Sequence, residues 1–285
     1  MDIRRVLKDA KGLTPTEAQL ARSVLAMGER VQTLSIKELA QATSTSIASI
    51  HRLCKKLGLE GYKELKVELA RASARSAENP EVNFDFPFDA GWGPDRVSAG
   101  LKSLYKSAIE ETLDVLDMKE LGRAADLVRQ ASVVDVYTES HNIHPAEMFV
   151  DRMLAAGRQA VCHEEFERKM RSALMADETH VALLISYSGV SEFYEKTLPV
   201  LAERGVPMVL IGAQMARDRH PGLSAYLLVG DSESTTYRIT QFASHISVQY
   251  VLDTLYGCVI AGDYERSMDF IKESLPYTRK PGLEE

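Results

Sequence analysis

The sequence predicts two domains, a helical N-terminal domain followed by an α/β domain with a parallel five-stranded sheet flanked by helices. Residues 1–77 show helical periodicity. From Ser132 onward, short apolar runs alternate with helical stretches, which is typical of a parallel sheet covered on both faces. Between these regions the helical periodicity stops, and residues 76–94 contain three prolines, two glycines and no basic residue. We therefore expect domains at 1–77 and 97–285, joined by a linker at 78–96.

Three helices of the first domain are predicted from their start signals. Thr14-Pro15-Thr16-Glu17 and Ser35-Ile36-Lys37-Glu38 both fit a capping box, in which the first side chain caps the helix and the glutamate reaches back. Ser46 is placed to cap the third helix. Apolar residues of that helix follow the i, i+3, i+4, i+7 spacing of one buried stripe: Ile50, Leu53, Cys54 and Leu57.

The opposite side of the third helix is small, polar and positive, as a helix that enters a DNA major groove requires. Candidates for contacts with base edges lie near its start, and Ile47 is suited to a thymine methyl group: Thr45, Ser46, Ile47 and Ser49. Candidates for phosphate or base edges follow: Arg52, Lys55 and Lys56. The alternative is an ordinary helical hairpin with a solvated basic face.

Charge is distributed unevenly along the chain. Residues 1–77 contain 14 Lys and Arg against 8 Asp and Glu, a net charge of +6. The whole chain has a formal net charge of −7, so the remainder carries −13. A basic N-terminal domain attracts phosphate backbones, while the acidic remainder discourages non-specific binding to nucleic acid.

Residues 35–66 resemble, without gaps, the helix-turn-helix of RpiR-type bacterial transcription regulators. The matching positions are Leu39-Ala40, Ser46, Ser49-Ile50, Arg52, Lys56-Leu57-Gly58, Glu60-Gly61-Tyr62 and Leu65-Lys66. The sequence departs at Ser44, where the family usually has glycine in the turn. Because serine tolerates a left-handed backbone less well, we expect a strained or differently shaped turn there. The resemblance implies binding to double-stranded operator DNA by a homodimer or higher homo-oligomer.

Five apolar runs are the predicted strands of the second domain: residues 133–137, 159–162, 181–186, 207–211 and 225–229. The predicted helices cover 97–116, 118–130, 145–156, 164–174, 191–204, a short stretch near Met215, and 235–260. Ligands of such sheets bind at the carboxyl ends of the strands. The informative loop there is Ser186–Ser191, with three serines and a glycine at a helix N-terminus, where backbone N–H groups and the helix dipole favour an anion. The alternative is a serine-rich helix cap without a ligand.

The same loop resembles the phosphate-binding S-x-S-G-x-[ST] loop of SIS domains, which bind phosphosugars, and the resemblance covers residues 115–262. By matching, the phosphate would be held by Ser186, Ser188 and Ser191, with backbone contributed by Tyr187 and Gly189. In the first strand-to-helix loop Ser140 keeps the serine of the usual G-x-G-x-S, but both glycines are missing and Glu139 adds a negative charge. Glu139 is expected to point away, to bond sugar hydroxyls or an amino group, or to mark a ligand other than a standard phosphosugar.

Other residues with chemical potential give weaker signals. His141 and His144 flank the first loop, as caps or as ligand contacts, but a loop H-x-x-H alone is a weak metal motif, and we expect neither metal nor cofactor. His163 with Glu164-Glu165 is the candidate base of an aldose–ketose isomerase, or an exposed acidic helix start. Arg238, expected on the last long helix, faces a ligand, a partner subunit or solvent. The three cysteines are far apart and form no C-x-x-C motif, so neither a disulfide framework nor a zinc site is expected.

These observations together predict a cytoplasmic transcription regulator and not an enzyme. Its SIS-like domain would sense a phosphorylated sugar and alter operator binding. No run of eighteen apolar residues predicts a membrane span, and the first ten residues lack a secretory signal's apolar region. Two alternatives remain: an isomerase-type SIS enzyme, and a regulator whose SIS domain serves only as a dimerisation scaffold.

Overall fold

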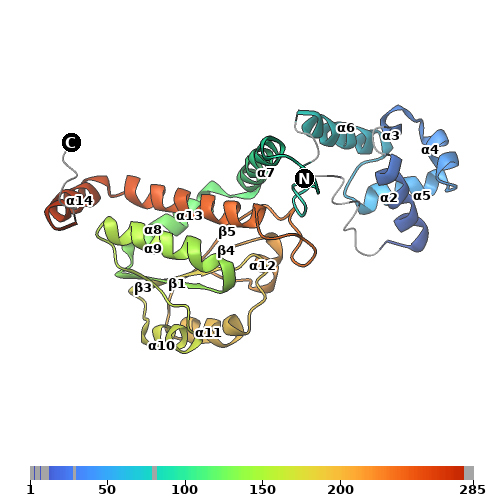
Figure 1. Cartoon of the computed structure of the whole chain (residues 1–285). Helices are drawn as coiled ribbons and strands as arrows, with labels where there is room; N and C mark the ends of the chain where they lie inside the picture. Colours follow the sequence, from blue (N-terminus) through green and yellow to red (C-terminus); the bar gives the residue numbers. More distant parts are fainter. Residues whose placement is uncertain (1–2, 4–6, 8–12, 28–29, 79–81, 279–285) are drawn as a thin grey trace. The chain divides into compact units, whose positions relative to one another are not determined.

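The computed structural model describes residues 3, 7, 13–27, 30–78 and 82–278. It divides the chain into two compact units at Val82 and Asn83. The first unit is helical (Figure 1), with α2 (Pro15–Met27), α3 (Arg30–Thr33), α4 (Ile36–Ala42), α5 (Ile47–Lys56) and α6 (Tyr62–Glu78). Its core includes the predicted stripe of α5, because Ile50, Leu53, Cys54 and Leu57 are all buried.

The predicted helix caps of the first unit are present. Thr14 and Glu17 exchange hydrogen bonds through side chain and backbone, as Ser35 and Glu38 do at the start of α4. The Ser46 hydroxyl accepts a hydrogen bond from the backbone N–H of Ser49 at the start of α5. Between α4 and α5 the chain turns through Ser44, whose φ of +51° is in the left-handed region, so serine takes there the conformation that glycine adopts more readily.

The second unit is a parallel sheet with helices on both faces. Its elements are α7 (Pro94–Val115), α8 (Met118–Gln130), β1 (Val133–Thr138), η1 (Ser140–Asn142), α9 (Ile143–Ala155), β2 (Ala160–Cys162), α10 (Phe166–Met175), β3 (His180–Ile185), α11 (Glu192–Glu203), β4 (Met208–Gly212), α12 (Gln214–Arg219), β5 (Ala225–Leu228), α13 (Ala243–Ala261) and α14 (Tyr264–Thr278). The five strands pair in parallel in the order β2-β1-β3-β4-β5.

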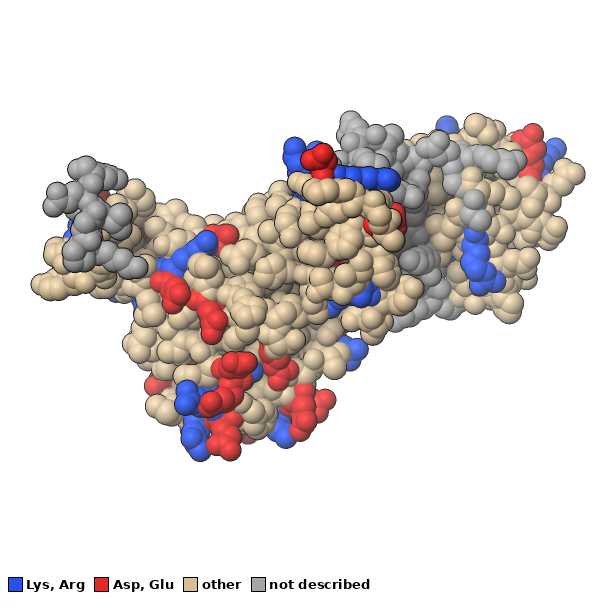
Figure 2. Space-filling view, viewed as in Figure 1, with Lys and Arg blue, Asp and Glu red and all other residues tan. Residues whose placement is uncertain are grey.

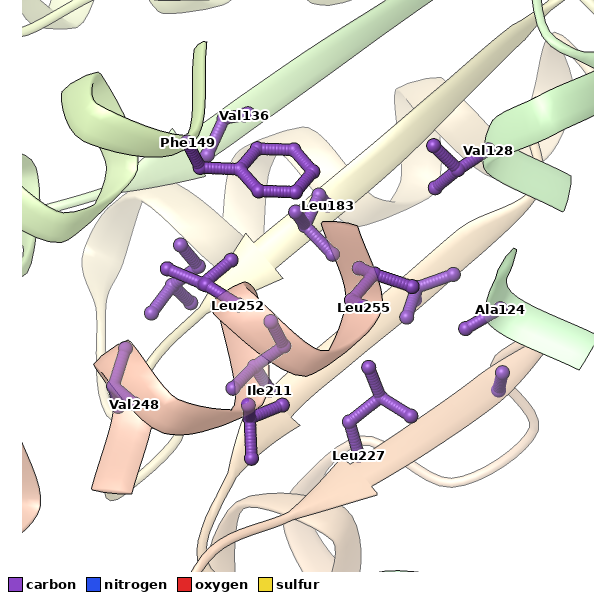
Figure 3. Packing of buried hydrophobic residues seen from close by; sticks show 14 of the residues in the cluster. Ala124, Val128, Val136, Phe149, Leu183, Ile211, Leu227, Val248, Leu252 and Leu255 are labelled. Atoms are coloured by element: carbon purple, nitrogen blue, oxygen red, sulfur yellow. The ribbon is translucent and has the colours of Figure 1, made fainter. Parts of the chain in front are cut away.

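Each face of this sheet has its own core. Helices α8, α9 and α13 pack on one face through residues such as Phe149 and Leu252, which meet Leu183 and Ile211 of the strands (Figures 1 and 3). Helices α10, α11 and α12 contribute to a second cluster with alternate strand residues such as Leu184. Strand residues buried on both faces explain why the sequence shows continuous apolar runs rather than alternation.

The structure corrects one predicted helix. The helix expected at 235–260 begins only at Ala243, so Arg238 lies in the irregular segment before α13 and not on a helix. The Ser234 hydroxyl accepts hydrogen bonds from the backbone N–H groups of Thr236 and Tyr237, and such side-chain bonds compete with helix formation. The chain also continues into α14, beyond the last predicted element.

Surface charge on the C-terminal unit is mixed. Acidic and basic side chains intersperse over α10 and α11 (Figure 2), where ion pairs link residues one helical turn apart, such as Arg171 with Glu167 and Lys196 with Glu192. Of the helices that the structure describes, none combines the length and the apolar character that crossing a membrane requires.

The packing of α13 on the sheet gives a testable prediction. Leu252 is 1% exposed, so Leu252→Ala should lower the free energy of unfolding of the C-terminal unit by about 2–5 kcal/mol through lost burial and a new cavity. Leu154→Ala is the matched control, because Leu154 is 48% exposed, and its effect should stay within about 0.5 kcal/mol. Urea denaturation measures both, and equal losses would contradict the assigned core.

Candidate functional site

The outward face of α5 carries most of the predicted DNA-contacting residues. Ser46, Ile47, Arg52, Lys55 and Lys56 are exposed, and Thr45 is half-buried. Ile47 at the first helical position is 38% exposed, although it is apolar. The structure therefore leaves these side chains accessible at the start and along one side of the helix.

Ser49 is an exception, and its predicted place on the outward face is wrong. It is 5% exposed, and its hydroxyl lies 3.0 Å from the Ser46 hydroxyl and accepts a hydrogen bond from Arg52 Nη2 at 3.0 Å. As the third residue of α5, Ser49 faces its own cap, Ser46, rather than the outward side. Ser49 thus contacts Arg52 and its own helix cap rather than the outward side.

A buried carboxylate on α2 also restrains the basic face. Glu17 accepts a hydrogen bond from Lys56 Nζ at 2.8 Å, and Arg52 Nε lies 3.9 Å from its other oxygen. The Glu17 side chain is only 3% exposed, whereas that of Arg52 is 62% exposed. The Lys56 ammonium, followed by the backbone of Thr14, lowers the pKa of Glu17 to about 2. Glu17 thus stays ionised, holds Lys56 by a hydrogen bond and lies near Arg52.

In the C-terminal unit the sheet order places a crevice between β1 and β3. The chain leaves β1 toward β2 and returns to β3 on the other side, so the loops after β1 and β3 diverge at their carboxyl ends. The buried Tyr194 hydroxyl lies 3.1 Å from the Tyr137 carbonyl oxygen and 3.0 Å from that of Ile185. Thr138 Oγ1 donates to the same Ile185 carbonyl at 3.0 Å. These bonds hold the two loop starts together.

A cavity of about 210 Å³ opens at this crevice. The predicted loops supply Ser140, Ser186, Tyr187 and Ser188, so the structure brings these residues together. Gly189 and Ser191 do not line the cavity. Residues outside the predicted set complete the lining: Glu139, His141, Asn142, Ile185, Val190, Tyr194, Thr235 and Arg238. Thr235 and Arg238 come from the loop after β5, which the parallel sheet places at the same edge.

Two glycines allow the serine loop to lie where it does. Gly189 has a φ of +70°, and a Cβ atom there would lie 2.8 Å from the Ala216 Cα. A Cβ atom on Gly212 would lie 2.2 Å from the Ser186 carbonyl oxygen. Within the loop, the Ser186 and Ser188 hydroxyls accept hydrogen bonds from the N–H groups of Gly189 and Val190. Both hydroxyls thereby keep their protons for a further acceptor.

Ser191 and Glu139 form a contact of their own. The Ser191 hydroxyl caps α11 by accepting from the Phe193 N–H at 3.1 Å, and it donates to Glu139 Oε2 at 2.6 Å. Glu139 therefore does not point away from the cavity but lines it. It is also paired, with Ser191. The Ser191 hydroxyl proton, which the sequence analysis expected to bond a phosphate, is donated to the Glu139 carboxylate instead.

Arg238 brings a positive charge to the cavity. Its side chain is 12% exposed and donates from Nη1 to Glu233 Oε2 at 2.7 Å. Glu233 is buried and also accepts from the N–H groups of Ala243 and Ser244, so it caps α13 from ten residues upstream. Sequence reasoning reached Arg238 but placed it on the wrong element, because Glu233 gives no capping signal at such a separation.

The histidines are distributed unequally around the cavity. Burial, followed by the nearby Arg238 guanidinium, lowers the pKa of His141, which is therefore neutral at pH 7. His163 and Glu165 do not line the cavity, and Glu165 pairs with Arg168 at the surface. In the part of the chain that the structure describes, no three His, Cys, Asp or Glu side chains are grouped to hold a metal ion.

Known proteins resemble this chain in sequence and in fold. Residues 3–76 match the family described as "Helix-turn-helix domain, rpiR family". An uncharacterized HTH-type transcriptional regulator of Caldanaerobacter subterraneus is 27% identical over 277 residues, 96% of this chain and 95% of that protein.

Two solved structures share the fold at lower identity. Vibrio vulnificus NanR, solved with ManNAc-6P, superposes with a TM-score of 0.56 at 18% identity, over 98% of this chain and 100% of that one. The sugar isomerase domain of an RpiR transcription factor from Sphaerobacter thermophilus gives 0.52 at 13% identity, over 62% and 96% of the two chains.

The Glu17 contacts predict a pH dependence. The pKa of Glu17 is lowered from 4.5 to about 2 in the folded chain, so its contribution to stability is present above pH 4.5 and is lost as the pH falls toward 2. Lys56→Ala should raise this pKa toward 4.5, because the Lys56 hydrogen bond is the largest cause of the shift. NMR titration of the Glu17 carboxyl carbon measures it, and Lys55→Ala should leave the value unchanged. A wild-type Glu17 that titrates near 4.5 would refute the assigned contacts.

Proposed function

The N-terminal domain of this chain is an RpiR-family helix-turn-helix domain and its C-terminal domain has the SIS fold, and from this premise we propose how a transcription regulator built in this way works. Helix α5 binds the major groove of operator DNA. The cavity between β1 and β3 binds a phosphorylated sugar, which changes operator binding. The observation that carries the proposal is the cavity itself, where the predicted serines meet Arg238.

The exposed face of α5 supports the DNA part of the proposal. Ser46 and Ile47 lie at the helix start, where recognition helices contact base edges, and Thr45 precedes them. Arg52 is exposed but held by the Ser49 hydroxyl, which suits an arginine that reads a base rather than one that only neutralises a phosphate. Lys55 and Lys56 are the proposed phosphate contacts.

The two lysines are expected to contribute differently. Lys56 already pairs with Glu17, so a phosphate must compete with a buried carboxylate for its ammonium group. Lys55 is exposed at the same end of α5. We therefore expect Lys55 to contribute more to the salt dependence of binding, while Lys56 chiefly fixes α5 against α2.

The cavity suits a ligand with an anionic end and a hydroxylated end. Ser186 and Ser188 retain hydroxyl protons for an acceptor, and Arg238 adds a charged donor. Glu139 on the other loop accepts hydrogen bonds and would bind sugar hydroxyl or amino groups. The NanR structure that shares this fold holds ManNAc-6P, a ligand that combines a phosphate with an acylated amino sugar.

An isomerase remains the second candidate, because a Listeria monocytogenes protein that shares this fold is described as a "putative sugar-phosphate isomerase". His163 and Glu165, which the sequence analysis considered as the base of an isomerase, do not line the cavity. The Caldanaerobacter subterraneus relative, which matches 96% of this chain, is described as an HTH-type transcriptional regulator. We therefore propose that the domain binds its ligand without converting it.

A homodimer is part of the proposal. Helix-turn-helix proteins bind two half-sites about one helical turn apart, and a two-fold arrangement of two chains supplies two α5 helices. The alternative of a C-terminal domain that only dimerises the chain predicts no ligand in the cavity at all.

The DNA part is tested on α5. Arg52→Ala should weaken specific operator binding by about 1–3 kcal/mol, because a base contact is lost. Lys55→Ala should weaken binding to all sequences equally and reduce its salt dependence. Mobility-shift titrations with DNA from upstream of the protein's own gene measure both variants.

Lys63→Ala is the matched control for these titrations. Lys63 is an exposed lysine on α6, outside the recognition helix, and its loss should leave affinity within twofold or so. If Arg52→Ala and Lys55→Ala bind as tightly as the control does, α5 is not the recognition helix.

The effector part is tested on the serine loop. Ser188→Ala removes a hydroxyl that would bond a charged group, at a cost of about 1.5–3 kcal/mol, so phosphosugar affinity should fall roughly 10- to 150-fold. Binding to DNA without effector should persist. Isothermal titration with a panel of ribose, arabinose, fructose and glucosamine phosphates and ManNAc-6P measures the change, after a thermal-shift screen of the same panel.

Two further variants calibrate this result. Ser98→Ala removes an exposed serine on α7 and should leave affinity unchanged. Glu139→Gln should raise affinity for ligands whose phosphate lies near the acid and lower it for ligands that donate to the acid. A wild-type protein that binds none of the panel would favour the dimerisation scaffold, and steady turnover of a panel sugar would favour the isomerase.

A further inference from the structure

The cavity is lined by the loops after β1 and β3 and by a third segment, which follows β5. This third segment also contacts the beginning of the C-terminal unit. This bridging segment, residues 232–242, lies between β5 and α13 and forms no helix or strand. Its residues alternate between two sides. Thr235 and Arg238 line the cavity, while Ser234, Tyr237 and Ile239 contact residues 83–88.

On the cavity side, Arg238 is the anchor of the bridging segment. Its guanidinium group bonds Glu233, which is buried and caps α13. An anion that binds Arg238 therefore contacts a side chain of an irregular loop. Within that loop, the Arg238 side chain is held by its bond to Glu233. Such a ligand would change the position or the freedom of this loop more than that of the strands beneath it.

On the other side, Asp85 is the main contact. Its carboxylate oxygen Oδ1 accepts a hydrogen bond from the Ser234 N–H at 2.6 Å, and its backbone carbonyl accepts one from the Ile239 N–H at 3.0 Å. Asn83 Oδ1 accepts from the N–H groups of Asp85 and Phe86, which closes a local turn around Asp85.

Aromatic contacts extend this junction. The ring of Phe86 lies 5.0 Å from that of Tyr237, and Phe88 lies 6.1 Å from Phe242, measured between ring centroids. Residues 83–88 are therefore held by two hydrogen bonds and two aromatic pairs from one short segment. Val82, the residue directly before them in the chain, is the last residue of the DNA-binding unit.

We propose that residues 83–88 transmit occupancy of the cavity to the DNA-binding domain through the bridging segment. Ligand binding at Arg238 shifts the bridging segment, and the bonds to Asp85 carry this shift to the chain that enters the helix-turn-helix unit. Asp85 is thus a positioning residue that contacts neither DNA nor ligand. This inference rests on the proposed effector function of the same cavity.

Thermodynamic reciprocity makes the proposal testable from either end. If the cavity is coupled to the DNA-binding domain through residues 83–88, operator DNA must change sugar-phosphate affinity by the same factor by which the sugar phosphate changes operator affinity. Asp85→Ala should reduce this factor in both directions, although Asp85 does not line the cavity. A ligand that binds equally well to both positions of residues 83–88 cannot change operator binding by this route.

The first experiment needs no ligand. Hydrogen exchange of the full chain is followed for the Asp85 and Phe86 amides in wild type, in Arg238→Ala and in the control Arg171→Ala, whose arginine pairs with Glu167 on the surface of α10. Arg238→Ala should accelerate exchange at these two amides about fivefold or more, and Arg171→Ala should not. Equal exchange in all three proteins would overturn the proposal.

The second experiment adds the ligand. Operator affinity is measured with and without the panel sugar phosphate that gives the largest thermal shift, in wild type, Asp85→Ala and the control Asp89→Ala. The sugar phosphate should change operator affinity equally in wild type and Asp89→Ala and at least fivefold less in Asp85→Ala, and operator DNA should change sugar-phosphate affinity correspondingly less in Asp85→Ala. The same response in all three proteins would overturn the proposal.

The two experiments separate this inference from the proposed function. If no sugar phosphate binds wild type, the effector assignment fails, and the exchange comparison still decides whether the cavity and residues 83–88 are coupled. If the sugar phosphate binds and acts but Asp85→Ala responds like wild type, the effector assignment stands and the coupling route is wrong.

Discussion

The Tyr194 hydroxyl group holds together the ends of the two strands whose following loops line the cavity. It reaches the last part of β1 and of β3 from α11, and its carbonyl partners belong to Tyr137 and Ile185. Burial raises the pKa of Tyr194, so the phenol remains a neutral donor at any ordinary pH. With these two strand ends fixed, the loops that begin at Glu139 and Ser186 start from defined positions, and their serines face one volume.

The sequence indicates this arrangement only in part. Continuous apolar runs predict the five strands and their parallel pairing, and the serine loop is found because Gly189 and the serines stand at a strand-to-helix junction. Arg238 is singled out by the sequence, but its place before α13 is not, because that place depends on Glu233, a carboxylate buried through four contacts with residues five to eleven positions away. The place of Ser49 is missed for a related reason. Helical periodicity places it outward, but the capping bond with Ser46 turns it toward its own helix end.

Both proposed binding surfaces use the same device, a cation held by a buried carboxylate. Glu17 holds Lys56 and approaches Arg52 in the first unit, and Glu233 holds Arg238 in the second. Such a pair orders a long side chain before binding, so less conformational entropy is lost when a ligand arrives. It also weakens attraction for any anion that cannot supply further contacts, because the cation already has a partner.

The charges around the cavity restrict what it can select. Arg238 is offset by Glu233, His141 is neutral, and Glu139 adds a carboxylate, so net charge does not attract a phosphate dianion. Attraction must instead come from oriented donors, namely the serine hydroxyls and the guanidinium group, which act over one hydrogen-bond length. A bare phosphate would gain these donors but would meet Glu139 nearby. A phosphosugar gains them too, and its hydroxyl or amino groups turn Glu139 into a partner. In the proposed function, the acid that replaces the usual glycine-rich pattern would change the selection from phosphate alone to the phosphate together with the sugar that carries it.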